Sequence, residues 1–318
     1  MTATLRSITE QFPFWKKAQM PEKLQATDVP RIVIGCGTSY NLALSVAAAM
    51  NANGISALAV PAGEWIVRPQ AYSTAKSCDV IALSRSGEST ETVQAAEASR
   101  ARGQHVIGIT CAPGSSLSKA SDTPIEFATH PQEGIVMTCS ASLMLMAGLA
   151  LAGVAFTEAE IDKAQAFMTA MDAVDVAVYG PRSHFVFLGG GVNYGVALEG
   201  ALKLQEMAIC YTQGFHPGEY RHGPVSLLDE KTCVVMLYSE ETRKHESELV
   251  KELQDKGAVV LGVGGDGDIA LAHGFSDGAA ALGVLPALQI LGERYAVRKG
   301  IDTTAPRNLT KVVMLEAK

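Results

Sequence analysis

The stretch RIVIGCGTSYNLAL, residues 31–44, decides the fold because the chain repeats its pattern as HFVFLGGGVNYGVAL, residues 184–198. Gly35 corresponds to Gly189 at an offset of 154 residues (189 − 35). The same offset relates Gly103 to Gly257, so the similarity extends over roughly 70 residues. We interpret this as two fused copies of one domain.

Each copy begins as an apolar strand that enters an Ala/Leu-rich helix through a glycine turn. In the first copy, residues 79–83 form a second apolar run, residues 91–102 have helical spacing that ends at Gly103, and residues 105–110 again favour a strand. This order of strands and helices predicts parallel strands with crossover helices. We therefore expect an α/β fold with two tandem, doubly wound parallel sheets, whose ligands bind beyond the carboxyl ends of the strands.

The 318 residues are enough for two domains of about 150 residues each. We expect a helical arm over residues 1–28, a first, phosphate-binding domain over 29–155, a helical connector over 156–182, and a second domain with a C-terminal lid over 183–318.

The composition excludes several classes of protein. Lys and Arg number 26 against 33 Asp and Glu, so the net charge of −7 provides no nucleic-acid surface. The longest apolar run, residues 143–156, is too short to span a membrane and predicts a buried helix. Residues 1–10 lack an apolar signal core, and the six cysteines form no C-x-x-C pair. We therefore expect a cytoplasmic protein with reduced thiols and no metal.

A hydroxyl-rich turn, SRSGEST at residues 84–90, stands where a strand ends and a helix begins. A helix N-terminus carries partial positive charge and unpaired N–H groups, so hydroxyls there suit a phosphate monoester. The alternative is that these serines only cap the helix. Because GCGTS, residues 35–39, leaves a neighbouring strand, we expect both turns to bind one phosphate. The second copy has YSEETR at residues 238–243, so we expect only the first copy to bind it.

Three charged residues of ALEGALKLQE, residues 197–206, share one face of a helix, namely Glu199, Lys203 and Glu206. Such a face is usually a solvated ion-pair network, and an acid/base site is the alternative. The loop GEYRHGP, residues 218–224, contains His222, which is either a surface histidine or a catalytic group.

These motifs, together with PRNLTK at residues 306–311, resemble the sugar isomerase (SIS) family in residue type and in order. They resemble most closely the isomerase half of glucosamine-6-phosphate synthase, a glutamine:fructose-6-phosphate amidotransferase. The resemblance implies two flavodoxin-like SIS domains, a phosphorylated sugar as ligand, no cofactor, and a homodimer in which the histidine comes from the neighbouring subunit.

The resemblance also implies roles for single residues. Glu206 corresponds to the carboxylate that moves a proton between C1 and C2, His222 to the histidine that opens the sugar ring, and Lys311 to the lysine that forms a Schiff base. Lys203 is the fourth implied catalytic position. The implied phosphate-binding residues are Ser39, Ser84, Arg85, Ser86 and Ser89, and the implied sugar-binding residues are Cys36, Gly37, Thr38, Val136, Thr138, Glu199 and Thr310.

Departures from the synthase pattern affect the expected reaction. Thr2 follows Met1 where the synthase has its catalytic cysteine, so we expect no glutaminase activity. Arg85 replaces a glutamine, and Ser140 replaces a lysine. The leading hypothesis is deamination of glucosamine 6-phosphate to fructose 6-phosphate and ammonia, or the ketose/aldose isomerisation alone. The alternatives are a fructosamine-6-phosphate deglycase, which depends less on Lys311, and a non-catalytic sugar-phosphate sensor.

Overall fold

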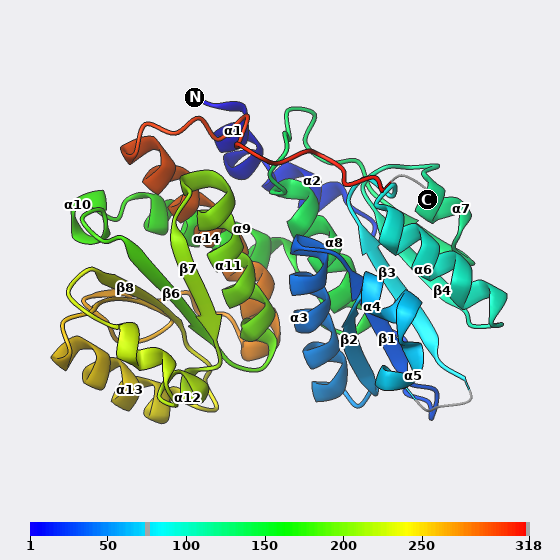
Figure 1. Cartoon of the computed structure of the whole chain (residues 1–318), viewed down its shortest axis with the longest axis horizontal. Coiled ribbons are helices and arrows are strands. Elements are labelled where there is room, and N and C mark those ends of the chain that lie inside the picture. Colours follow the sequence, from blue (N-terminus) through cyan, green and yellow to red (C-terminus); the bar gives the residue numbers. More distant parts are fainter. Residues whose placement is uncertain (74–76, 316–318) are drawn as a thin grey trace. The chain divides into compact units, whose positions relative to one another are not determined.

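The structure is a computed structural model that describes residues 1–73 and 77–315 (Figure 1). The chain divides into two compact units. Pro13–Phe156 and Thr310–Lys318 form the first-copy unit, and Met1–Phe12 with Thr157–Leu309 form the second-copy unit. The C-terminal segment from Thr310 thus belongs with the first copy, whereas we expected it to follow the second. The domain limits given above otherwise stay a prediction.

The first-copy unit contains a five-stranded sheet in the order β2-β1-β3-β4-β5. All neighbouring strands are parallel, and Ile32 of the first strand lies opposite Leu58 on one side and Val80 on the other. The strands are β1 (Arg31–Gly35), β2 (Ala57–Pro61), β3 (Asp79–Ser84), β4 (Val106–Thr110) and β5 (Thr123–Glu126).

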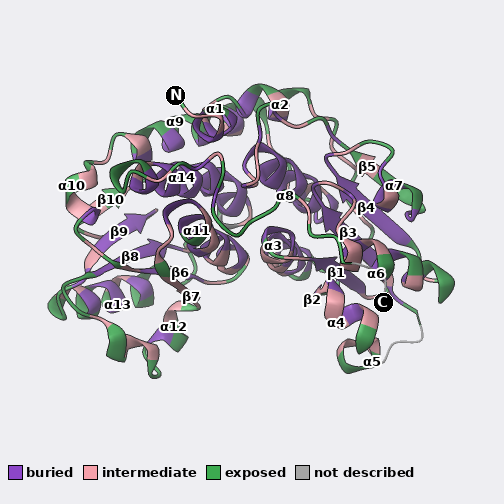
Figure 2. Cartoon of the chain, turned by 45° about the horizontal axis from the view of Figure 1, so that its top comes forward, coloured by how far each residue is buried: buried purple, intermediate pink, exposed green. Residues whose placement is uncertain are grey.

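Helices cover both faces of this sheet, so the central strands β1, β3 and β4 are buried, whereas the edge strands β2 and β5 are partly exposed (Figure 2). One face packs against α3 (Thr38–Ala52) and α8 (Cys139–Leu151), and the other against α4 (Ala62–Val67), α6 (Thr90–Ala101) and α7 (Ser116–Lys119). The buried α8 confirms the helix expected from the apolar run. The short helices α2 (Phe12–Lys17) and α5 (Pro69–Tyr72) complete this part of the chain.

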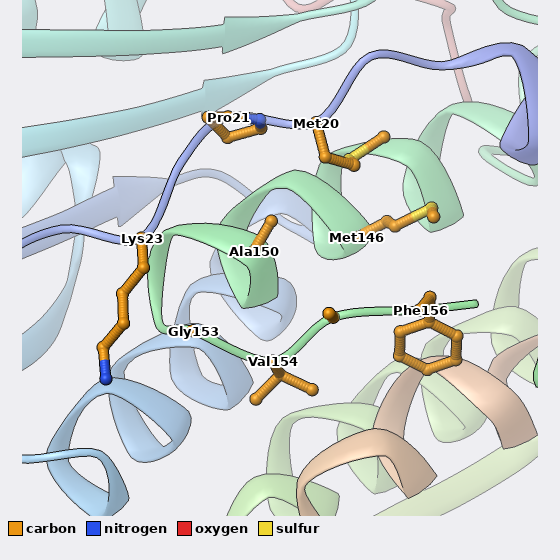
Figure 3. A pocket seen from close by; sticks show the side chains of 9 residues that line it. Met20, Pro21, Lys23, Met146, Ala150, Gly153, Val154 and Phe156 are labelled. Atoms are coloured by element: carbon orange, nitrogen blue, oxygen red, sulfur yellow. The ribbon is translucent and has the colours of Figure 1, made fainter.

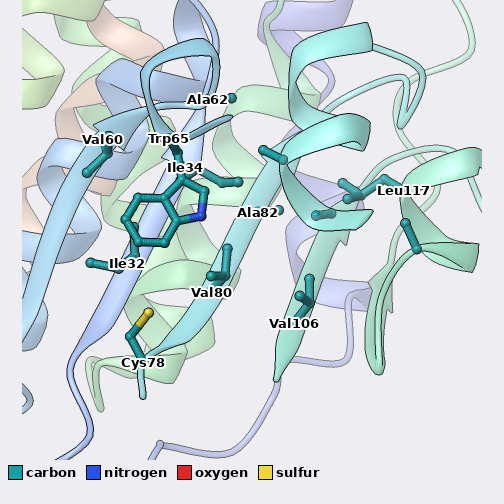
Figure 4. Packing of buried hydrophobic residues seen from close by; sticks show 13 residues of the cluster. Ile32, Ile34, Val60, Ala62, Trp65, Cys78, Val80, Ala82, Val106 and Leu117 are labelled. Atoms are coloured by element: carbon teal, nitrogen blue, oxygen red, sulfur yellow. The ribbon is translucent and has the colours of Figure 1, made fainter. Parts of the chain in front are cut away.

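The core between the sheet and α4 is built around Trp65 (Figure 4). Alternate residues of neighbouring strands, including Ile34 and Ala82, point to the same face because side chains alternate along a strand. The Trp65 side chain is 1% exposed, and its indole Nε1 donates to Ser99 Oγ at 2.9 Å. This aromatic side chain therefore joins α4 to α6 across the sheet surface.

The second-copy unit has the same topology, with the order β10-β9-β8-β6-β7 and parallel pairs throughout. Counted from the first strand of each copy, both orders are 2-1-3-4-5, which is the flavodoxin-like order. The predicted fold class is thereby confirmed. The strands are β6 (His184–Gly189), β7 (Tyr211–Phe215), β8 (Thr232–Leu237), β9 (Val259–Val263) and β10 (Ile269–Leu271).

Helices also sandwich the second sheet. On one face lie α9 (Glu158–Asp172), α11 (Val192–Ala208) and α14 (Asp277–Arg298), and on the other α12 (Pro217–Tyr220) and α13 (Arg243–Asp255). The shorter elements are α1 (Ala3–Thr9), α10 (Val176–Tyr179) and the 3-10 helix η1 (Pro224–Leu227). No helix among residues 1–73 and 77–315 has the length and apolarity to cross a membrane.

The two glycine turns have the same backbone conformation. Gly37 has φ 55° and ψ −125°, and Gly191 has φ 55° and ψ −126°, at an offset of 154 residues (191 − 37). Glycine adopts positive φ without the steric cost that other residues meet. The repeat found in the sequence is therefore also a repeat in three dimensions.

Replacing Trp65 with alanine is expected to lower the free energy of unfolding of the first-copy unit by about 3–5 kcal/mol, because the change leaves a cavity beside the sheet. Urea denaturation followed by circular dichroism measures the loss. Trp65→Phe, which removes the bond to Ser99 but keeps a ring, should lose less. Equal midpoints for Trp65→Ala and the unaltered protein would show that this side chain does not support the core.

Candidate active site

The hydroxyl-rich turn connects the end of β3 to the start of α6. Ser84 Oγ donates to Ser89 Oγ at 3.4 Å, and Ser86 Oγ accepts from the Glu88 N–H at 3.2 Å. Ser89 is the N-cap residue of α6, yet its side chain makes no capping hydrogen bond. Gly87 has φ 64°, and a Cβ there would lie 2.0 Å from Ser115 Oγ. The geometry thus favours hydroxyls held near a helix N-terminus over simple capping.

The glycine turn after β1 lies beside the hydroxyl-rich turn. Cys36 Sγ is 3.7 Å from Thr92 Oγ1 in the first turn of α6, and burial raises the pKa of the Cys36 thiol. Thr38 and Ser39 are each 5% exposed at the start of α3. A Cβ on Gly37 would meet no atom within 4 Å, so there is open space next to this residue. The structure therefore brings the two predicted turns together.

Arg85 lies within the hydroxyl-rich turn but points to other segments of the same unit. Its guanidinium donates to Gly134 O at 3.0 Å and to Lys311 O at 2.7 Å, and the residue is only 8% exposed. The phosphate-binding role expected for Arg85 stays a prediction. Its hydrogen bonds show that it links the turn to the loop before α8 and to the C-terminal segment.

Glu133 was not predicted, although its carboxylate is the centre of the hydrogen bonds in the loop before α8. Its Oε1 accepts from both the backbone N–H and the hydroxyl of Thr138 and of Ser140, and its Oε2 accepts from Thr129 Oγ1 at 2.6 Å. The residue is 4% exposed. Burial first, and then the Glu133 charge, raises the pKa of the Cys139 thiol to about 12. The sequence signal that could have indicated Glu133 was its position as a single acidic residue before an apolar helix.

The remaining predicted residues of this unit lie on the same loop and on the C-terminal segment. Val136 and Thr138 are buried. Thr310 Oγ1 donates to Val312 O at 3.0 Å, and Lys311 Nζ donates to the backbone oxygen of Glu133 at 3.0 Å. The Lys311 amine thus reaches the loop that carries the expected sugar-lining positions.

The charged face of α11 is buried. Glu199 and Lys203 are 0% exposed, while the Glu206 side chain is 19% exposed. Lys203 Nζ lies 3.2 Å from Glu199 Oε1 and also donates to Glu206 Oε2. Burial acts to lower the pKa of Lys203, but the two carboxylates and their hydrogen bonds outweigh it, and the pKa is raised. This is a fixed positive charge between two carboxylates and not a solvated network.

Glu206 lines a pocket of about 280 Å³ in the second-copy unit. The other lining residues come from the end of α11 and from the terminal motif, and they are Leu202, Gln205, Ile209, Arg307, Asn308 and Leu309. A partly exposed carboxylate that accepts from a buried ammonium can exchange a proton with a bound ligand. The two motifs therefore meet at one pocket.

His222 is exposed on the loop that follows α12. The preceding residue, Arg221, pairs with Glu252 at 2.8 Å, which ties this loop to α13. An exposed imidazole is available to a ligand or to a second subunit, and the assignment of His222 stays a prediction.

In the second copy, the turn that corresponds to the hydroxyl-rich turn is hydrogen-bonded to Glu246, an acidic residue of α13. Glu246 is 2% exposed, and its carboxylate accepts from the Ser239 N–H at 2.9 Å and from Thr242 Oγ1 at 2.8 Å. A neighbouring pocket of about 250 Å³ is lined by Gly190, Thr242 and Glu246, among others. The carboxylate stands at the start of α13 and would repel a phosphate there.

Another pocket, of about 290 Å³, lies in the first-copy unit (Figure 3). It is lined mainly by apolar side chains such as Met20, Met146 and Phe156, with Lys23 as the charged residue among those that line it. It contains none of the predicted site residues, so it does not compete with the two turns as the ligand site. Within the described part of the chain, no group of three or more His, Cys, Asp or Glu residues could hold a metal ion.

A family model described as "SIS domain" matches residues 29–153 and 179–274. The chain therefore belongs to the SIS domain family, and the resemblance seen in the motifs is confirmed.

Curated relatives agree with this assignment. A glutamine–fructose-6-phosphate aminotransferase (isomerizing) of Pyrobaculum aerophilum is 29% identical over 310 residues, which is 89% of this chain and 51% of the relative. The corresponding protein of Aquifex aeolicus is 30% identical over 312 residues, covering 90% and 52%. The chain thus spans about half the length of these relatives.

Solved structures are similar over nearly the whole chain. Glucosamine-6-phosphate deaminase from Thermotoga maritima has a TM-score of 0.85 and 32% identity, with 99% of this chain and 100% of that chain covered. Tagatose-6-phosphate ketose/aldose isomerase from Escherichia coli has a TM-score of 0.77 and 26% identity, covering 98% and 90%. These neighbours are phosphosugar enzymes by name, which supports an enzymatic role.

Replacing Lys203 with methionine should lower the free energy of unfolding of the second-copy unit by about 3–5 kcal/mol, because the buried Glu199 carboxylate loses its cation. The double change Lys203→Met with Glu199→Gln should recover part of the loss. Urea denaturation followed by circular dichroism provides the measurement, and Lys251→Met, at an exposed position of α13, is the control. If Lys203→Met alone were as stable as the control, the ion pair between Lys203 and Glu199 would not be important for stability.

Proposed function

We propose that the protein is an amino-sugar phosphate deaminase/isomerase, which converts glucosamine 6-phosphate and water to fructose 6-phosphate and ammonia. The observation that carries this proposal is Glu206, a partly exposed carboxylate that is bound to a buried lysine and lines a pocket with the terminal motif. Similarity along the full chain to a glucosamine-6-phosphate deaminase supports the same substrate class.

In the proposed mechanism, the hydroxyls of the two turns bind the phosphate, and His222 assists opening of the sugar ring. Glu206 then takes the proton from C2 and returns it to C1, while one proton of the amine moves to O1, so that the aldehyde becomes an alcohol and the C2 amine becomes an imine. Lys203 Nζ donates to Glu206 Oε2 and so holds this carboxylate in a fixed orientation for the transfer.

Lys311 completes the proposed reaction. Its amine attacks C2, ammonia leaves, and the resulting lysine imine is hydrolysed by water to fructose 6-phosphate and the free lysine. Along the chain, Lys311 comes two residues after Leu309, the last residue of the segment Arg307–Leu309 that lines the Glu206 pocket. A homodimer is part of the proposal, with the exposed His222 serving the site of the neighbouring subunit.

Two other functions remain alternatives with distinct chemistry. A fructosamine-6-phosphate deglycase would use the carboxylate and histidine but depend less on Lys311. A non-catalytic sensor would bind the phosphosugar without turnover, and the joint presence of Glu206, His222 and Lys311 argues against it.

Ammonia release from a panel of phosphorylated amino sugars and fructosyl-amines tests the proposal. Glucosamine 6-phosphate should be the best substrate, and Glu206→Gln should reduce its turnover by about 10²-fold or more, because proton transfer between C1 and C2 stops. Glu248→Gln, at an exposed position of α13, is the matched control. Equal ammonia release by the Glu206 and Glu248 variants would remove Glu206 from the mechanism.

Borohydride reduction in the presence of fructose 6-phosphate should trap a sugar adduct on the peptide that contains Lys311, and mass spectrometry locates it. Lys311→Ala should lose the adduct and about 10²-fold or more in turnover, since a covalent activating group is gone. Lys256→Ala, at the exposed end of α13, should keep both. An unlabelled Lys311 with near-normal turnover of its alanine variant would favour the deglycase.

A further inference from the structure

The C-terminal segment is bound to the hydroxyl-rich turn by hydrogen bonds at both of the turn's ends (Figure 1). At one end, Arg85 donates to Lys311 O at 2.7 Å. At the other end, Thr90 Oγ1 accepts from the Leu315 N–H at 3.0 Å. Two main-chain groups of the segment therefore depend on side chains that flank the expected phosphate ligands.

Arg85 makes a second contact of the same kind. Its other guanidinium nitrogen donates to Gly134 O at 3.0 Å, next to Glu133, whose backbone oxygen accepts from Lys311 Nζ at 3.0 Å. The planar guanidinium of Arg85 thus binds the main chain of Lys311 and also the main chain of the loop before α8, which the Lys311 side chain contacts. A lysine at position 85 would have a single ammonium and no such fork.

We propose that Arg85 is a positioning residue for Lys311, and that phosphate bound by the neighbouring serines strengthens its hold on the C-terminal segment. The inference rests on the proposed function for its catalytic meaning. Ser84 and Ser86 are the direct neighbours of Arg85 in the chain, so a ligand that orders the backbone of this turn also orders the Arg85 side chain. Phosphate binding and the positioning of Lys311 then favour the same conformation of the turn. Two events that favour one conformation are thermodynamically linked, so each should promote the other.

This role predicts effects that differ from those of a phosphate ligand. Loss of a phosphate ligand weakens phosphate binding directly, as expected for Ser86→Ala. Loss of Arg85 should leave the affinity for inorganic phosphate within about threefold and release the C-terminal segment. Charge-assisted hydrogen bonds to carbonyl oxygens are strong. The fraction of molecules with a detached C-terminal segment should therefore be about tenfold higher in the Arg85 variant than in the unaltered protein.

Limited trypsin digestion measures release without requiring turnover, because trypsin cleaves after Lys311. We expect Arg85→Gln to be cut at this bond about 10-fold faster than the unaltered protein, and Arg85→Lys at an intermediate rate. Inorganic phosphate should slow the cut in the unaltered protein and have little effect in Arg85→Gln. Arg68→Gln is the matched control, because Arg68 is an exposed arginine of the same unit that pairs with Glu64.

Equal cleavage rates for Arg85→Gln and the Arg68→Gln control would overturn the proposal. It would also be overturned if Arg85→Gln lost as much phosphate affinity as Ser86→Ala and were not cleaved faster. If Arg85→Gln does not fold, Thr90→Val tests the other attachment and should also accelerate cutting. Borohydride trapping adds the catalytic readout, in which Arg85→Gln should label Lys311 about 10-fold more slowly. A protein that releases no ammonia would refute the proposed function but leave the digestion result valid.

Discussion

Parallel pairing of the first and third strands in each copy determines where ligand chemistry can be placed. Ile34 of β1 lies opposite Ala82 of β3, so the chain leaves both strands at the same edge of the sheet. The next residues of both strands must then share one small region, whatever their side chains are. In the first copy these residues are glycine and hydroxyl-bearing residues at helix N-termini, and the strand order reverses between them. The fold therefore provides the location, and a few substitutions decide what binds there.

Two buried charges, one in each unit, hold neighbouring residues of the candidate site in place. Lys203 is enclosed with two carboxylates on one helix, and Glu133 is surrounded by hydroxyl and amide donors of one loop. A buried charge is tolerated only with partners of good geometry, so each one restricts the conformation of its neighbours. Lys203 in this way orients Glu206, and Glu133 orders the start of α8. Burial of charge thus restricts the conformation of both segments.

The repeat, the parallel sheets and the adjacency of the two turns could be predicted from local patterns and from the rules of parallel sheets, whereas the flavodoxin-like strand order was implied only by the family resemblance. The spacing of Glu199, Lys203 and Glu206 predicted a common helix face, but not its burial, which depends on helices packed against α11. Glu133 and the bonds of Arg85 could not be predicted. Arg85 and Lys311 are hydrogen-bonded although they are 226 residues apart in the sequence, and no periodic pattern predicts such a contact.

Glu246 gives the second copy a property that the first copy lacks. Its carboxylate already accepts hydrogen bonds from the turn after β8, so the helix end that could attract an anion is occupied by the chain itself. A tethered group competes at a very high effective concentration, and a free anion would have to displace it. In the second copy the turn is therefore paired within the chain, whereas in the first copy the Ser89 side chain makes no capping hydrogen bond. The two copies therefore present an approaching anion with different helix N-termini, although their backbones follow the same path.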